Sequence, residues 1–272
     1  MFYHQRRHSP HNNVLIPSGE ARLVGWSRSM LYSGFSTLPR SVVRLADSSV
    51  RWDNTDVIRL IIMATHPRLH IEFAAGSSMA AILRRGPTEW TQLLLWDTAT
   101  DELESGSWFH GRIYEDSCSI SPDGKLFSYL AAKYQGNFGG DDCNSWTAIC
   151  KPPWLTAIAF WPQLGTQGIS TDFVDDSTLM ISHPHWDELV PREELPAEFN
   201  VLSKITGKRA PEQSLPEPAK SSAQFHNNRG LDQQSRTFEY RDGKLNRNDA
   251  VIADLSSMTP DPQKSPKWAR SW

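Results

Sequence analysis

Three side chains of types that commonly ligate metal ions alternate within one short motif, His183-Pro184-His185-Trp186-Asp187. The motif directly follows an apolar run, Thr178–Ser182, which predicts a β-strand. Alternate residues at a strand end point in the same direction, so these three side chains would converge. The spacing makes His183, His185 and Asp187 the candidate metal ligands of the chain.

The same motif resembles the metallo-β-lactamase signature, in which two His and one Asp bind one or two zinc ions. The resemblance implies a zinc-dependent hydrolase in which a metal-bound hydroxide attacks the substrate. The chain departs from that pattern, because Glu188 stands where a further His belongs and His226 is the only later His. The motif also comes late in the chain, whereas that family carries it early. The alternative interpretation is a polar loop after a strand, with no metal and no cofactor.

Six of the 11 tryptophans fall between residues 90 and 161. Exposed tryptophans could stack on sugar rings or contact an apolar partner, whereas in an all-β domain most are expected to pack in the core. Trp96 ends the apolar run Leu93–Leu95 and precedes Asp97. We therefore predict that Trp96 packs between neighbouring sheets while Asp97 holds the following turn. The sequence contains no nucleophile elbow, phosphate-binding loop or dinucleotide fingerprint, so a non-enzymatic role is the leading interpretation.

The elements that position these residues are strands joined by tight turns. Ser121-Pro122-Asp123-Gly124 has the residue types of a β-turn, and the apolar run after it is typical of a buried strand. Asp242-Gly243 repeats the turn signal, and Asp176-Ser177 is a weaker copy. Residues 187–229 hold five prolines and few aliphatic residues, which predicts a long polar insertion or linker.

The Ser-Pro-Asp-Gly-Lys hairpin resembles blades of β-propellers of the WD40 and TolB-like kinds, and Leu93-Leu94-Leu95-Trp96-Asp97 resembles their third strand. A wider resemblance, to a group of uncharacterised bacterial proteins, covers about residues 63–185. It is carried by motifs that include Trp96-Asp97, Gly111-Arg112-Ile113-Tyr114, Lys151-Pro152-Pro153 and Ala159-Phe160-Trp161-Pro162. These resemblances imply a small or partial propeller of antiparallel blade-like sheets, with a β-sandwich as the alternative. A fold of this kind does not by itself imply an activity.

Charge divides the chain near Met63. Residues 1–62 hold eight arginines, no lysine and four acidic residues, a net charge of +4, whereas residues 63–272 carry −7. We therefore expect residues 1–62 to be a non-core leader, either disordered or not translated, or else a transit peptide. Residues 63–272 are expected to form a single all-β domain.

Composition narrows the function classes. The overall net charge of −3 disfavours a nucleic-acid surface. The sequence contains no run of about 18 apolar residues, so it predicts no membrane span. The chain has three cysteines and no CxxC pair, which indicates free thiols in a reducing compartment. A cytoplasmic location is therefore expected. The sequence thus predicts an interaction module for an unknown protein or small ligand, with the zinc-dependent hydrolase as the alternative.

Overall fold

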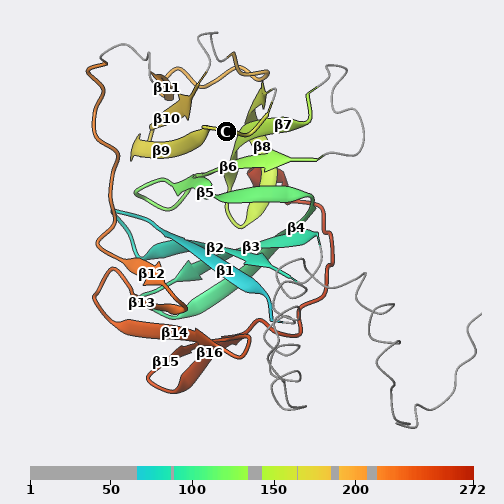
Figure 1. The fold of residues 1–272 in the computed structure, drawn as a ribbon, viewed down its shortest axis with the longest axis vertical. Helices are drawn as coiled ribbons and strands as arrows, with labels where there is room; N and C mark the ends of the chain where they lie inside the picture. Colours follow the sequence, from blue (N-terminus) through green and yellow to red (C-terminus); the bar gives the residue numbers. More distant parts are fainter. Residues whose placement is uncertain (1–65, 87–88, 134–142, 164, 185–189, 207–212) are drawn as a thin grey trace, which may run out of the picture. The chain divides into compact units, whose positions relative to one another are not determined.

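The computed structural model describes residues 66–86, 89–133, 143–163, 165–184, 190–206 and 213–272. All of them belong to one compact unit of the chain. Their strands form four sheets, none of which closes on itself, and a 3-10 helix, η2 (Lys267–Arg270), follows near the C-terminus (Figure 1). The predicted all-β class is confirmed. The predictions for residues 1–62 lie outside the described residues.

Two of the sheets are four-stranded and run in sequence order with every neighbouring pair antiparallel. Sheet I consists of β1 (Arg68–Phe73), β2 (Met79–Arg85), β3 (Trp90–Asp97) and β4 (Glu102–His110). Sheet II consists of β5 (Arg112–Ile120), β6 (Phe127–Ala132), β7 (Ser145–Lys151) and β8 (Trp154–Gln163). Such four-stranded meanders are the blade-like sheets that the turn chemistry predicted.

The other two sheets differ in strand number. Sheet III consists of β9 (Ser170–Asp175), β10 (Thr178–His183) and β11 (Asn200–Ile205). Sheet IV consists of β12 (Gln224–His226), β13 (Arg229–Leu231), β14 (Thr237–Arg241), β15 (Lys244–Arg247) and β16 (Ala250–Asp254). The pair β10–β11 is parallel, an exception to the antiparallel prediction. Parallel pairing needs a connection of a dozen or more residues, and residues 184–199 supply it.

The segment predicted as a polar insertion, residues 187–229, includes strands. It contributes β11 and β12 to two different sheets, and Phe199 within it is buried in the cluster that joins sheets II and III. Its many charges and prolines concealed these strands, because β11 is largely exposed and owes its place to pairing with the buried β10. Residues 187–189 and 207–212 of this segment lie outside the described residues.

The predicted turns lie at hairpins. Asp123-Gly124 joins β5 to β6, where the Gly124 N–H donates to the carbonyl of Ser121 at 2.8 Å. Asp242-Gly243 joins β14 to β15, with φ of 53° and 80°. Positive φ at both central residues is the geometry of the tight hairpin turn that Asp-Gly favours. Both turn predictions are confirmed.

The core consists of clusters between neighbouring sheets, and sheet I is buried on both of its faces. Along β2, Ala80 and Ile82 pack against sheet IV, whereas Ala81 and Leu83 pack against sheet II. A third cluster joins sheets II and III. A strand buried on both faces needs a continuous apolar run, which explains why β2 and β3 lack a polar alternation.

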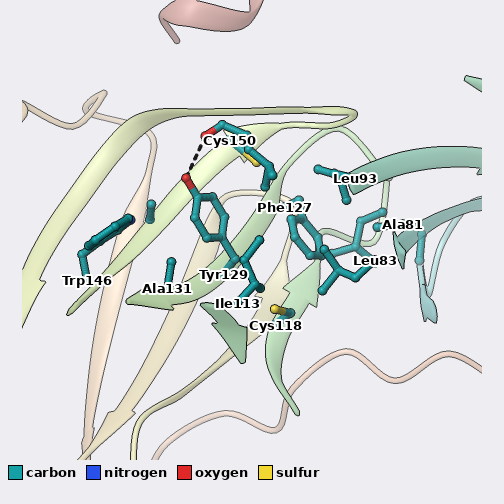
Figure 2. Close-up of a cluster of buried hydrophobic side chains, with 14 residues drawn as sticks. Ala81, Leu83, Leu93, Ile113, Cys118, Phe127, Tyr129, Ala131, Trp146 and Cys150 are labelled. Carbon is teal, nitrogen blue, oxygen red and sulfur yellow. Dashed lines mark hydrogen bonds between the residues drawn. The ribbon is translucent and has the colours of Figure 1, made fainter. Parts of the chain in front are cut away.

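Figure 2 shows the cluster between sheets I and II, in which Tyr129 points into the apolar side chains. Its hydroxyl donates to the carbonyl of Leu155 at 2.7 Å. Burial raises the pKa of Tyr129 and of the thiols of Cys118 and Cys150 in the same cluster. These groups are neutral core components.

Trp96 is fully buried between sheets I and IV. Its ring meets Phe238 edge-on at a centroid distance of 5.2 Å and lies 6.4 Å from Phe73. Asp97 accepts a hydrogen bond from the Ala99 N–H at 2.9 Å, which fixes the β3–β4 turn. Both predicted structural roles are confirmed.

Candidate functional site

The predicted metal ligands are only partly covered by the structure. His183 is the last residue of β10 and is buried, with Nε2 2.6 Å from the Ser203 hydroxyl on β11. His185 and Asp187 lie outside the described residues. Within the described part of the chain, no group of three or more His, Cys, Asp or Glu side chains is placed to hold a metal ion. The zinc hypothesis therefore stays a prediction.

A different group of side chains surrounds a cavity of about 510 Å³ where sheets I and II meet. We call it the cationic cavity, because three basic side chains line it. Its lining residues are Arg85, Glu89, His110, Gly111, Arg112, Tyr114, Ala132 and Lys133.

Strand ends bring the cations together. Arg85 ends β2, Arg112 begins β5, and Lys133 directly follows β6. Arg112 pairs with Ala132, so the start of β5 and the end of β6 lie side by side. Gly111 is the single residue between β4 and β5, and a Cβ there would lie 2.6 Å from the Phe109 ring. This direct connection places the end of sheet I beside the start of sheet II.

The two arginines of the cavity carry unsatisfied hydrogen-bonding capacity. Burial and then repulsion from Arg112 lower the pKa of Arg85, and the attraction of Glu115 only partly opposes this. Glu115 lies 3.6 Å from Arg85 Nη1, too far for a hydrogen bond. Among the described residues, Arg85 Nη1 and Arg112 Nε are buried without a hydrogen-bond partner. Two cations that repel each other at one cavity provide a favourable site for an anion.

The rim of the cavity is aromatic and more exposed. The ring of His110 stacks on Trp90 at a centroid distance of 4.8 Å, and its Nε2 lies 3.4 Å from a carboxylate oxygen of Glu89. Glu89 is an acidic lining residue whose side chain is 83% exposed, so solvent screens its charge. Arg112 lies over the Tyr114 ring at 5.3 Å, which holds the guanidinium by a cation–π contact. The interior of the cavity is therefore positively charged.

The arrangement suits an oxyanion. A guanidinium presents a planar fork of donors that matches a carboxylate or a phosphate, and a second guanidinium nearby adds charge. Sequence reasoning did not find this site, because neither Arg85 nor Arg112 lies in a motif that predicts ligand binding. The available signal was the pair of arginines at strand ends, Arg85 and Arg112, but their convergence depends on how the two sheets pack.

Comparison of the chain with protein-family models, with curated proteins and with solved structures finds no match in any of the three. No helix among the described residues has the length and apolar character required to cross a bilayer. The cavity geometry is therefore the basis for a functional proposal.

Proposed function

We propose that this protein is a non-enzymatic binding module that recognises an oxyanion group, a carboxylate or a phosphate, of a small ligand in the cationic cavity. One observation carries the proposal: Arg85 and Arg112, whose positive charges repel each other, line the same cavity. An anion would supply acceptors for both groups and would remove their mutual repulsion.

We include in this proposal that the fold is a partial propeller, which is compatible with a binding role. Two consecutive four-stranded antiparallel meanders, with cores between successive sheets, are compatible with a partial WD40- or TolB-like propeller. The cationic cavity lies where two of these sheets meet. Buried thiols at Cys118 and Cys150 support the proposed cytoplasmic location.

The test is calorimetric titration of the full chain with inorganic phosphate and, separately, with a small dicarboxylate such as succinate. At least one of the two should bind, and Arg112→Gln should weaken that binding about tenfold or more, which corresponds to one lost charge-assisted bond. Affinity should also fall with added sodium chloride. The matched control is Arg229→Gln on sheet IV, whose side chain is 82% exposed and which should bind as the parent does.

The two arms separate the two oxyanion sources. Tighter binding of phosphate identifies a phosphorylated ligand, and tighter binding of succinate identifies a carboxylate. The proposal is overturned if neither anion binds, or if Arg112→Gln and Arg229→Gln weaken binding equally.

A further inference from the structure

The cationic cavity is one part of a longer row of positive side chains. Arg68, the first residue of β1, is the cross-strand partner of Arg85 at the end of β2. Directly opposed residues of an antiparallel pair carry their side chains on the same face of the sheet, with Cβ atoms about 4.5–5.5 Å apart. The side chain of Arg68 therefore starts beside that of Arg85, which lines the cavity.

The row continues into sheet II. Arg112, at the start of β5, lines the cavity together with Arg85. Arg112 pairs with Ala132 at the end of β6, and Lys133 follows Ala132 and lines the same cavity. Each member of the row is thus placed next to the following one by a strand pairing or by the shared cavity. We call these four residues the cationic row: Arg68, Arg85, Arg112 and Lys133.

Arg85 is repelled by a neighbour on each side of it in the row. Burial, then the charge of Arg112 and the charge of Arg68, lowers the pKa of Arg85, and the attraction of Glu115 opposes this. Like charges directly opposite each other on two strands destabilise a sheet. An anion bound across Arg68 and Arg85 would offset this cost, because each guanidinium would gain a charge-assisted hydrogen bond.

The balance of charge favours a phosphate over a carboxylate. Glu115 lies 3.6 Å from Arg85 Nη1, and Glu89 lines the cavity with a side chain that is 83% exposed. The four cations of the row and these two carboxylates leave an excess of two positive charges among the six groups. A phosphate monoester carries a charge of about −1.5 to −2 at pH 7, whereas one carboxylate carries −1.

The row is extended along the ends of four strands. Neighbouring strands of a sheet lie about 4.8 Å apart, so Arg68 and Lys133 start two strand spacings and one inter-sheet gap from each other. A single phosphate is matched by one or two guanidinium groups. Two linked phosphates reach further along the row, and each of them can contact a different pair of neighbouring cations.

We propose that the anion bound at the cationic row is a diphosphate group, with one phosphate between Arg85 and Arg112 in the cationic cavity and the other beside Arg68. This inference rests on the proposed function of the cavity. It goes beyond that function because it selects phosphate over carboxylate and adds Arg68, which is not among the lining residues. Arg68 is exposed, so the second phosphate lies on the solvent side of the first.

The experiment is calorimetric titration of the full chain with inorganic phosphate, with inorganic pyrophosphate and with ADP as a diphosphate ester, in metal-free buffer at constant ionic strength. At least one of the two diphosphates should bind about tenfold more tightly than phosphate, which corresponds to one further charge-assisted bond. Tighter binding of pyrophosphate identifies the free ion as the ligand, and tighter binding of ADP identifies an ester.

Arg68→Gln tests the place of the second phosphate. It should weaken binding of the tighter diphosphate about tenfold and leave phosphate binding nearly unchanged, because Arg68 contacts only the second group. The matched control is Arg229→Gln, which removes another exposed arginine, on sheet IV, and should change neither affinity. The Tm of Arg68→Gln should equal that of the parent, since the side chain is exposed.

Two results would overturn the inference. In the first, neither diphosphate binds more tightly than phosphate. In the second, Arg68→Gln lowers the affinities for diphosphate and phosphate by the same factor. Either result leaves the proposed function intact provided that phosphate or succinate binds through Arg112, whereas binding of no anion at all overturns both. Should Arg68→Gln fail to fold, the ratio of the parental affinities for diphosphate and phosphate decides.

Discussion

The charged side chains at the two interfaces of sheet I differ in their partners. Where sheet I meets sheet IV, the charged side chains bind one another or backbone carbonyls. Where sheet I meets sheet II, Arg85 lies 3.6 Å from Glu115, repels Arg112 and lines a cavity together with it. Because one sheet forms both interfaces, the comparison tests which charged groups hold the fold and which are available to a ligand.

The interface with sheet IV is closed by a small ionic network. Arg247 of β15 contacts Asp101 Oδ1 and Asp232 Oδ2, both at 2.8 Å, and lies over the ring of Trp96. Arg236 contacts Asp232 at 2.9 Å. The side chain of Asp232 is completely buried, so the two arginines are needed to stabilise its negative charge.

The interface with sheet II has the opposite character. Arg85 and Arg112 repel each other there, and both line the cationic cavity. The cavity is lined by residues from sheet I and from sheet II. The proposed anion would offset this repulsion.

Trp96→Ala should have the largest effect on stability. Trp96 is fully buried among Phe73 and Phe238, so removing its ring leaves a large cavity between sheets I and IV. We expect a loss of about 3–5 kcal/mol, a large part of the 5–15 kcal/mol that typically stabilises a domain. Urea unfolding monitored by circular dichroism measures it.

Trp90→Ala is the matched control for that substitution. Trp90 is half-buried and stacks on His110 at the cavity rim, so its loss should cost clearly less stability. A Trp96→Ala protein that unfolds at the parental urea concentration would show that the ring is not a packing element, and would remove the assigned role of the interface with sheet IV.

Arg247→Met should have the next largest effect. It keeps much of the apolar stem but removes the bonds to Asp101 and Asp232, while Arg236 still pairs with Asp232. We expect a loss of about 1.5–3 kcal/mol, the value of hydrogen bonds to charged groups. The control is Arg112→Met at the interface with sheet II, which should cost little because no hydrogen bond of Arg112 Nε is lost. Equal losses in the two variants would contradict the contrast between the interfaces.

Acid titration sharpens the same comparison. Burial opposes ionisation of Asp232, but the Arg236 backbone N–H and the charges of Arg247 and Arg236 outweigh it and lower its pKa. A carboxyl whose pKa is lower in the folded state contributes stability above its unfolded pKa of about 4, and loses it as the pH falls. The parent should therefore lose stability below about pH 4 more steeply than Arg247→Met does.

Much of the architecture was readable because it depends on local chemistry. Asp123-Gly124 and Asp242-Gly243 predict hairpins because the backbone angles of a tight turn depend on the turn residues themselves. The burial of Trp96 was predicted from the apolar strand that it ends just before a turn. Each of these signals spans only a few residues, and the turn signal recurs at more than one hairpin of the fold.

The proposed binding site could not be predicted in the same way. Arg85 and Arg112 are 27 positions apart, and their meeting depends on how sheet I packs on sheet II. The strand β11 was hidden because its pairing with β10, rather than its own apolar pattern, places it in sheet III. Long-range pairing of this kind leaves no local signal in a single sequence.

The smallest expected effect concerns the zinc hypothesis. His183→Ala removes the contact with Ser203 across β10 and β11, and should cost about 1 kcal/mol, the value of one hydrogen bond. Elemental analysis of the purified parent and variant should show no stoichiometric zinc in either, because His183 is the end of a buried strand and already contacts Ser203. Stoichiometric zinc in the parent that disappears in His183→Ala would instead support a metal site formed with His185 and Asp187. That result would place a ligand site at the end of β10, in sheet III. The comparison of the two interfaces of sheet I would then no longer cover every proposed ligand site.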